Sequence, residues 1–361
     1  MFLYLTADTV GIETGGGVVT QNEFNALDEL SDDESFALWS RQELETWRQQ
    51  DPERYGRDPW CWDNVANEML THFLANNSPP RLCHVYAGTF TQTVARLKSV
   101  GCKVTYTAAA HDVEASKREH EQLKIPFDHP HLTDPGQFRQ YVGGYLNADK
   151  LICPSTHSAN VMKGFGREDE IAIVPHGVNL PASVKPLPSR FTVGYLGSFG
   201  PDKGVRYLLE AWKRLNYKDA TLLLAGRDSS SPWGRFLIQQ FGGGSIATLG
   251  WVKDVSHFYD QLSLYVQPSV TEGFGIEVLE ALAHGRSVLC SSGAGACDVL
   301  RYESPLHQVI PGNVDALAHR IHWHKIDPVV SAVDGRRIAE DFTWGKVRKQ
   351  YQDVWSSLLK G

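Results

Sequence analysis

Short apolar runs alternate with amphipathic stretches along this chain, and the alternation predicts its fold class. In the front half, apolar runs typical of buried strands cover 2–8, 82–88, 102–111, 151–155 and 171–178. In the rear half, such runs cover 191–197, 220–226, 246–252, 264–269 and 287–292, and helical spacing covers 203–215 and 276–284. Strands that alternate with helices are typical of parallel sheets covered by helices on both faces. We therefore predict an α/β protein with two doubly wound, Rossmann-like domains that face each other across a cleft.

A proline-rich stretch at 180–190 separates the two halves and marks the predicted domain boundary. We expect an N-terminal domain over 1–185, a C-terminal domain over 186–343 and a closing amphipathic helix over 344–361. The segment 36–68 departs from the alternation because it contains four tryptophans: Trp39, Trp47, Trp60 and Trp62. We interpret it as an inserted helical segment, which either covers the cleft or forms a surface subdomain with its own aromatic core.

Composition and charge narrow the classes of partner. The 361-residue chain is 42% apolar and 21% charged, which is enough apolar material for large cores. Its net charge is 35 − 42 = −7, which divides into 16 − 25 = −9 for 1–185 and 19 − 17 = +2 for 186–361. An acidic front half is a poor attractant for nucleic-acid backbones or anionic lipid. Charge therefore indicates neither kind of partner.

Further features predict a cytoplasmic protein without a metal. No apolar run reaches the ~18 residues that span a bilayer, and the start, MFLYLTAD, lacks the basic segment of a signal peptide. The six cysteines include no Cys-x-x-Cys pair, which is typical of reduced and mostly buried thiols. The histidines show no metal-ligand spacing, so we expect no bound metal.

The segment 264–292 carries the most informative chemistry. A loop with Glu272 and the glycines of 273–275 follows a predicted strand, and the next helix carries Glu280. Glycines before a helix let backbone N–H groups approach a ligand, and a helix N-terminus favours negative charge. Carboxylates beside such an anion site repel a phosphate unless they serve hydroxyl groups. The pattern therefore predicts a ligand with both phosphate and vicinal diols, such as a nucleotide sugar.

The same segment resembles the Glu-x7-Glu block of the family 4 retaining glycosyltransferases, which have the GT-B fold. The neighbouring motifs follow the family's order, with VGYLGSFGPDKGVRYLLEAW, LLLAGRD and LGWVKDV before the block and FTWGKVRKQYQDVW after it. In the front half, ADKLICPS and IVPHGVNLP resemble the end of the family's first domain and its linker. The resemblance covers most of 1–35 and about 102–361, and it is weakest over 36–70.

The resemblance implies the fold and the reaction. The closing helix would cross back onto the N-terminal domain, as in other GT-B proteins. The enzyme would be a hexosyltransferase that moves a sugar from a nucleotide diphosphate sugar to an acceptor hydroxyl, with retention at the anomeric carbon. It would need no metal and no permanently bound cofactor, because the nucleotide sugar is a co-substrate.

Roles for single residues are also implied by the resemblance. Glu280 would accept hydrogen bonds from the ribose diol, and Glu272 would bind hydroxyls of the donor sugar. Lys203 would neutralise the departing diphosphate and so stabilise the leaving group electrostatically. His111, at the end of a strand, would either contact the donor sugar or hold a structural hydrogen bond. The implied catalytic set is His111, Lys203 and Glu272. The other implied donor-binding residues are Gly16, Gly17, Ser198, Gly273, Phe274, Gly275 and Ile276.

Two positions depart from the family's pattern. Ser198 stands where family members usually have an arginine that serves as a second diphosphate cation. Either Arg206 or Arg227 could compensate for it. Glu277 stands where the family often has proline or another uncharged residue.

Other functions and several acceptors stay open. The same fold serves nucleotide-sugar epimerases and phosphorylases, and the chain could also be a non-catalytic sugar-nucleotide-binding protein. The tryptophans of 36–68 could stack on a sugar ring or a base, so the acceptor could be a glycan, a small aglycone or a modified base. The early stretch 21–35 holds acidic residues and no Lys or Arg, unlike the basic, apolar helices of members that dock on membranes.

Overall fold

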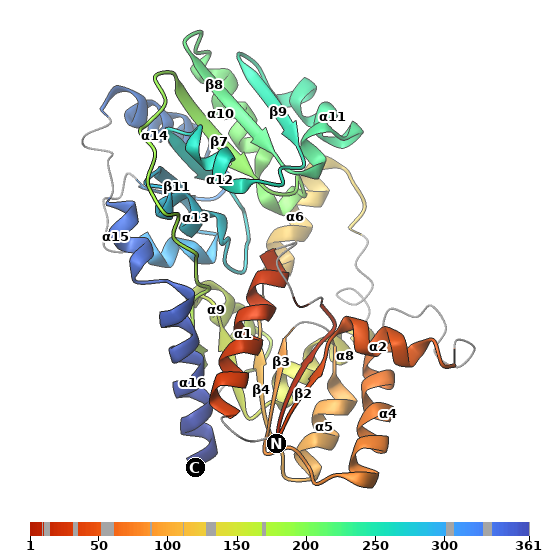
Figure 1. Cartoon of the computed structure of the whole chain (residues 1–361). Coiled ribbons are helices and arrows are strands. Elements are labelled where there is room, and N and C mark those ends of the chain that lie inside the picture. Colours follow the sequence, from red (N-terminus) through yellow and green to blue (C-terminus); the bar gives the residue numbers. More distant parts are fainter. Residues whose placement is uncertain are drawn as a thin grey trace.

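Two parallel sheets, one in each half of the chain, form the two lobes of the molecule (Figure 1). The computed structural model describes residues 1–8, 10, 15–31, 35–51, 61–86, 89–110, 112–127, 135–167, 171–300, 307–327 and 334–360. The predicted α/β class with two doubly wound sheets is confirmed.

The N-terminal lobe has a six-stranded sheet with the order β2-β1-β3-β4-β5-β6. Its strands are β1 (Phe2–Thr6), β2 (Phe36–Trp39), β3 (Leu82–Tyr86), β4 (Lys103–Thr107), β5 (Lys150–Cys153) and β6 (Ala172–Ile173). Its helices are α1 (Gly15–Ser31), α2 (Arg41–Arg48), α4 (Cys61–Asn76), α5 (Thr91–Ser99), α6 (Val113–Leu123), α8 (Pro135–Asn147) and α9 (Thr156–Gly164). All five residues of β1 are buried, as expected for a strand with helices on both faces.

The C-terminal lobe has a second six-stranded parallel sheet, with the order β12-β11-β10-β7-β8-β9. Its strands are β7 (Phe191–Leu196), β8 (Ala220–Ala225), β9 (Ile246–Gly250), β10 (Leu264–Gln267), β11 (Ser287–Ser291) and β12 (Gln308–Val309). Its α-helices are α10 (Val205–Leu215), α11 (Pro232–Phe241), α12 (Val255–Asp260), α13 (Glu277–Ala283), α14 (Val314–Ile326) and α15 (Gly335–Glu340). Short 3₁₀ turns are η1 (Pro201–Lys203), η2 (Arg227–Ser230) and η3 (Gly295–Leu300).

Each sheet has a switch point, where successive connections turn to opposite sides. In the N-terminal lobe it lies between β1 and β3, and in the C-terminal lobe it lies between β7 and β10. Ligands of doubly wound sheets bind outside the carboxyl ends of the strands at such points. The end of β7 is therefore the first place to look for a site in the C-terminal lobe.

For the described part of 36–68, the predicted helices are confirmed by α2 and α4, but the prediction of a separate insert is wrong. The first four residues of this segment form β2, which pairs in parallel with β1 from Phe2↔Phe36 onward. Trp39 is buried in the core of the N-terminal lobe, and Trp47 and Trp62 pack against the same core. Trp60 lies outside the described residues. The tryptophans thus serve the main core, because β2 and α4 extend the sheet and its helical cover rather than forming a separate unit.

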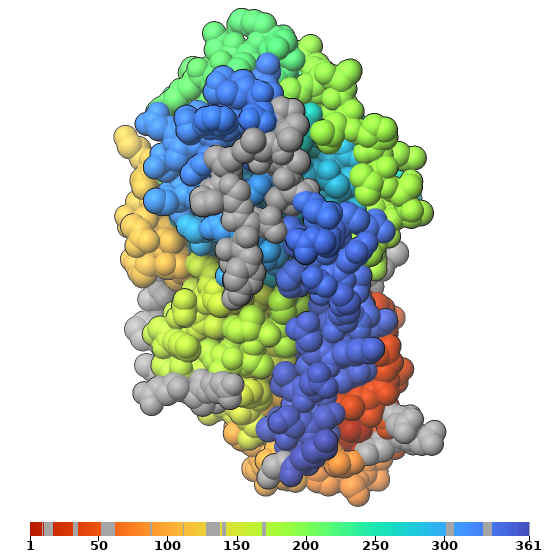
Figure 2. Space-filling model, turned by 90° about the vertical axis from the view of Figure 1, so that its left-hand side faces the viewer, coloured from red at the N-terminus to blue at the C-terminus, as the bar shows by residue number. Residues whose placement is uncertain are grey.

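The closing helix α16 (Trp344–Lys360) crosses from the C-terminal lobe onto the N-terminal lobe, as predicted. Figure 2 shows it running down the molecule in blue beside α1 in red. Its buried side chains are Trp344, Val347, Tyr351 and Trp355. These positions lie on one face of a helix, and they join the hydrophobic cluster of β1 and α1. Crossing back therefore buries the apolar stripe of the helix.

A buried polar cluster joins α16 to the N-terminal lobe. Both oxygens of the Glu23 carboxylate on α1 are used: Tyr351 donates to Oε1 at 2.6 Å and Tyr4 donates to Oε2 at 2.9 Å. His84 Nε2 lies 3.1 Å from Oε2. Burial alone raises the pKa of Glu23, but His84 and the hydrogen bonds outweigh it and lower this pKa below its usual value. Glu23 is therefore ionised at neutral pH inside the lobe.

We predict that Glu23→Gln destabilises the protein in a pH-dependent way. Removing one partner of a buried ionic cluster costs about 3 kcal/mol at pH 7. Because the folded-state pKa of Glu23 is lowered, its contribution is present above the unfolded pKa of 4.5 and is lost as the pH falls through the lower folded value. Urea denaturation should thus show a smaller deficit at pH 3.5 than at pH 7. Glu29→Gln, on the exposed side of α1, is the control. A deficit of the same size in both variants would contradict the prediction.

Candidate functional site

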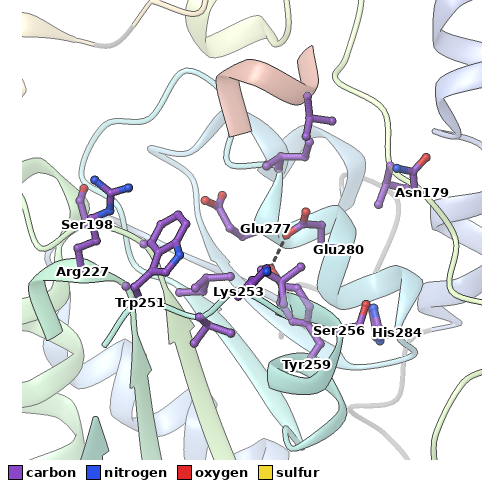
Figure 3. Close-up of a pocket in the computed structure, with 18 of the residues that line it drawn as sticks. Asn179, Ser198, Arg227, Trp251, Lys253, Ser256, Tyr259, Glu277, Glu280 and His284 are labelled. Carbon is purple, nitrogen blue, oxygen red and sulfur yellow. Dashed lines mark hydrogen bonds between the residues drawn. The ribbon is translucent and has the colours of Figure 1, made fainter. Parts of the chain in front are cut away.

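A pocket of about 650 Å³ lies between the lobes, at the switch point of the C-terminal sheet (Figure 3). The carboxyl ends of β7, β8 and β9 supply wall residues 196–198, 226–228 and 251–253, and α13 supplies Glu277 and Glu280. The N-terminal lobe side is closed by Val18 of α1 and by Trp344 at the start of α16. Ligand sites of this size are usual for nucleotide-sized molecules.

Of the predicted donor-binding residues, those on the wall of this pocket are Ser198, Ile276 and Glu280. The predicted residues beside the wall rather than on it are Lys203, Glu272, Gly273, Phe274 and Gly275. The predicted site residues are thus divided between the pocket and the adjoining loop 272–275, whose Glu272 is paired with Lys203.

The two glycines of the N-terminal lobe that the resemblance implies as donor-binding residues lie in a helix. Gly16 and Gly17 belong to the first turn of α1, which begins at Gly15, and Thr20 donates to the carbonyl of Gly17 at 3.0 Å. Val18 reaches the pocket, so this helix end does face the donor side of the cleft.

His111 lies outside the described residues; its neighbour Asp112 contacts the glycine loop region, and its neighbour Ala110 accepts a hydrogen bond from Ser158 of α9. Asp112 donates its backbone N–H to Thr271 Oγ1 at 2.6 Å, and Ser158 Oγ donates to the carbonyl of Ala110 at 2.8 Å. The end of β4 therefore meets the C-terminal lobe at this loop. His157, which the sequence reading passed over, also contacts Thr271, with Nε2 3.0 Å from Oγ1.

Glycine at 273 is required by this meeting of the lobes. A Cβ at Gly273 would lie 2.4 Å from the carbonyl oxygen of Ala109, which is too close for any side chain. The carbonyl of Gly273 accepts from Ser155 Oγ at 2.7 Å and Ser158 Oγ at 2.9 Å. On its other side the loop is held by η3, because Gly295 donates its N–H to Glu272 at 3.0 Å. The loop is thus fixed between both lobes.

Phe274 fills the space beneath the loop. It is buried, and the ring of His176 meets it edge-on with centroids 5.0 Å apart. Burial lowers the pKa of His176 to about 4, so this ring is neutral at physiological pH. The contact fits a structural rather than a catalytic histidine.

Glu280 is the wall residue whose carboxylate is oriented by a hydroxyl. Tyr259 of α12 donates to Glu280 Oε2 at 2.7 Å, drawn as the dashed line in Figure 3. Burial raises the pKa of Glu280, and the bond from Tyr259 partly offsets that rise. Within the described residues no hydrogen bond occupies Oε1. The carboxylate can therefore accept hydroxyl groups from a ligand in the pocket.

Lys203 and Glu272 form an ion pair beside the pocket. Lys203 ends the turn η1, one residue before α10, so the predicted helix start at Lys203 is two residues early. Burial by itself lowers the pKa of Lys203, but the negative charges of Glu272 and Asp202 raise it overall. The lysine is therefore charged at neutral pH. Both side chains keep about a quarter of their surface exposed (26% and 20%), so a ligand can reach the pair.

Glu277 is the most perturbed acid on the wall, and the sequence reading noted it only as unusual. Burial, followed by the nearby charges of Glu272 and Glu280, raises its pKa to about 7. Three carboxylates crowd one end of α13, with Lys203 as a nearby positive charge. Glu277 therefore changes between neutral and charged near physiological pH.

The two arginines proposed as substitutes for a cation at 198 lie in different places. Arg206 pairs with Glu119 of α6 at 3.1 Å, in contact between the lobes, and also donates to Gln122. Arg227 lies on the pocket wall, with its guanidinium carbon 4.6 Å from the ring centroid of Trp251. Trp251 and Tyr259 were missed from the sequence, because Trp251 fell inside the predicted strand 246–252, whereas β9 ends at Gly250 and leaves Trp251 on the pocket wall.

Among the described ranges there is no group of three or more His, Cys, Asp or Glu side chains placed to hold a metal ion. In the same part of the chain, no helix has the length and apolarity needed to cross a bilayer. The described thiols are free, and burial raises the pKa of Cys83. His129 and His131 lie outside the described residues.

Comparisons with known proteins bear on the family and the fold. Residues 190–324 match the family model described as Glycosyl transferases group 1. The lipopolysaccharide core biosynthesis mannosyltransferase LpcC of Rhizobium leguminosarum bv. viciae is 26% identical over 234 residues, which are 58% of this chain and 65% of that protein. The chain spans about half to two thirds (45–65%) of the length of the first curated relatives that it matches.

Solved structures share the whole architecture. Sucrose-phosphate synthase from Thermosynechococcus elongatus superposes with a TM-score of 0.77 at 18% identity, over 99% of this chain and 98% of that one. Anabaena HepE in complex with UDP-glucose superposes with a TM-score of 0.72 at 16% identity, over 99% of this chain and 100% of that one. Identities this low show the fold alone, and the fold is GT-B, as predicted.

We predict that Glu277→Gln stabilises the protein at alkaline pH. The folded protein keeps a proton on Glu277 that the unfolded chain releases above pH 4.5, so stability falls between pH 4.5 and about 7. The glutamine removes this loss, which is worth about 3 kcal/mol once it is complete above pH 7. Thermal unfolding should show a higher Tm for the variant at pH 8.5 and little difference at pH 4.5. Glu340→Gln is the charge-matched control, since the Glu340 side chain is exposed at the end of α15. An equal increase in Tm at both pH values would argue against titration of Glu277 in this range.

Proposed function

We propose that this chain, whose residues 190–324 form a domain of the Glycosyl transferases group 1 family, is a retaining glycosyltransferase. It moves a sugar, a hexose, from a nucleotide diphosphate sugar to an acceptor hydroxyl. The observation that carries the proposal is the Glu280 carboxylate, oriented by Tyr259 in a pocket at the switch point of that domain. The cytoplasmic location stays a prediction.

The donor fits the pocket by its chemistry. A carboxylate with one oxygen available accepts hydrogen bonds from a vicinal diol, which is the pattern of a ribose. The described pocket volume suits a nucleotide, and HepE, which shares the fold, was solved with UDP-glucose. The sugar would then lie towards Glu272 and the Gly273 loop, beside the N-terminal lobe.

The reaction proceeds through positioning and electrostatics. The bond from the anomeric carbon to the diphosphate oxygen breaks, and charge develops on that oxygen. Lys203 neutralises the charge from its place beside Glu272, and Glu272 accepts hydrogen bonds from the sugar hydroxyls. The acceptor hydroxyl approaches from the same face, forms the new bond and gives its proton to the departing phosphate oxygen. Retention follows because bond making and bond breaking use one face of the sugar.

The N-terminal lobe would supply the acceptor side. Its contacts with the loop at Gly273 bring the end of β4 close to the position of the sugar. A hydroxyl of a glycan or a small aglycone held there is adjacent to the anomeric carbon. An epimerase of the same fold needs no acceptor, and a non-catalytic protein would bind the donor without consuming it, so turnover separates these alternatives.

We predict that Glu280→Gln lowers affinity for the nucleotide sugar. Calorimetry with UDP-glucose, GDP-mannose and ADP-glucose identifies the donor that binds the wild type most tightly. Loss of a charged acceptor weakens binding of that donor by about 10-fold or more. Tyr259→Phe should have a smaller effect, because the carboxylate remains but loses its orientation. Glu340→Gln should bind like the wild type. Wild-type affinity in Glu280→Gln would refute the assignment of this pocket.

We further predict that Lys203→Met lowers kcat about 100-fold, since one cation is lost at the leaving group. The assay is slow hydrolysis of the donor, followed by NMR at early times, before mutarotation mixes the anomers. The released sugar should keep the anomeric configuration that it had in the donor. Lys213→Met, on the exposed side of α10, is the control. An inverted sugar would exclude retention, and an unchanged kcat would exclude the role of Lys203.

A further inference from the structure

The charged side chains on the pocket wall determine which groups can bind the diphosphate of a donor. The acidic side chains on the wall are Asp228, Glu277 and Glu280. Lys203 is beside the wall and is already paired with Glu272. A diphosphate placed here therefore needs a further cation, since otherwise it meets mainly negative groups. The basic side chains on the wall are Arg227 and Lys253.

Arg227 is placed where strand ends converge. It follows Gly226, which has φ +120° and whose added Cβ would lie 2.0 Å from the carbonyl of Gly197. The end of β8 therefore touches the backbone just before Ser198. Figure 3 shows Arg227 and Ser198 together at one side of the pocket, with Glu277 and Glu280 across from them. A guanidinium here adjoins the position at which the sequence lacks an arginine.

Trp251 holds the Arg227 side chain at this place. The guanidinium lies over the indole ring at 4.6 Å, a distance typical of a cation–π contact. The indole is 55% exposed, which is unusual for so large a ring. Its role as a support for the guanidinium explains why it stands at the rim of the pocket rather than in a core.

The hydrogen-bonding groups of Arg227 are available. In the described part of the chain, the guanidinium makes no ion pair or hydrogen bond, so its donors can bind phosphate oxygens. Arg206 differs, because Glu119 and Gln122 already occupy its guanidinium at the contact between the lobes. Of the two arginines, Arg227 alone combines a place on the pocket wall with free donors.

We propose that Arg227, supported by Trp251, binds the diphosphate of the nucleotide sugar and supplies the cation that Ser198 does not. The inference rests on the proposed function, since it takes a nucleotide diphosphate as the ligand. Arg227 is a binding residue for the diphosphate, and Trp251 is a positioning residue that acts through it.

The test compares a diphosphate with the corresponding monophosphate. Calorimetry with UDP, GDP and ADP selects the nucleotide that the wild type binds most tightly, and its monophosphate is the second probe. Arg227→Ala should lower the affinity for the diphosphate about 10- to 100-fold and the affinity for the monophosphate less than about 3-fold. The reason is that the guanidinium contacts the phosphate that the monophosphate lacks. Arg235→Ala removes an exposed charge of the same lobe and should change neither affinity.

Trp251→Ala tests the positioning role. It should lower the diphosphate affinity by a smaller factor, and it should cause no further loss in the Arg227→Ala background. Trp251→Phe keeps a ring under the guanidinium and should restore most of the affinity. Neither variant should change the affinity for the monophosphate.

The results that would overturn the inference are distinct from those that overturn the proposed function. An Arg227→Ala variant with wild-type diphosphate affinity excludes the contact. Equal losses for diphosphate and monophosphate in Arg227→Ala assign the arginine to the nucleoside end, and equal losses in Trp251→Ala assign the ring to the base. If the wild type binds none of the three diphosphates, or if Glu280→Gln binds them normally, the proposed function itself fails.

Discussion

The close approach of the two lobes at Gly273 is the constraint on which the site depends. Its missing side chain lets the backbone of the loop pass against Ala109, and Ser155 and Ser158 donate to its carbonyl. Any Cβ at this position would push the lobes apart. Because the loop also carries Glu272 and leads into α13, the same contact sets where the carboxylates stand relative to the end of β4. One glycine thus couples the distance between the lobes to the geometry of the candidate site.

A second connection lies where the chain crosses between the lobes. Val178 donates its N–H to the carbonyl of Phe342 at 2.8 Å, so the outward and return crossings run side by side. A Cβ at Gly177 would lie 2.6 Å from the Trp344 ring, which also closes the pocket. From there α16 continues to the buried carboxylate of Glu23. The cluster around Glu23 therefore anchors the helix that begins at this crossing to the N-terminal lobe.

Charge at the site is balanced locally rather than by the lobe as a whole. The C-terminal half has a net charge of only +2, yet Glu272, Glu277 and Glu280 all stand near the start of α13. Burial and mutual repulsion make the charged form of Glu277 costly, and Lys203 offsets mainly its partner Glu272. A pocket with such a wall favours hydroxyl groups over bare phosphates, except where an arginine is free. The acidic side chains would therefore bind the hydroxyl groups of the ligand, and Arg227 would bind its phosphates.

Much of this protein could be predicted from local sequence signals, because they depend on short-range chemistry. Mainly apolar runs such as 2–6 mark buried parallel strands, and the spacing of Glu272 and Glu280 around Gly273 predicts a site without any knowledge of the fold. The Trp-rich segment misled the interpretation because local composition does not say which core an aromatic ring enters. Pairing of Phe36 with Phe2 decides that, and it is a contact over 34 residues of chain. Likewise, sequence could not choose between Arg206 and Arg227, since each stands at the start of a helical segment that follows a strand. The choice follows from partners distant in the chain: Glu119 occupies one guanidinium, and Trp251 holds the other over the pocket.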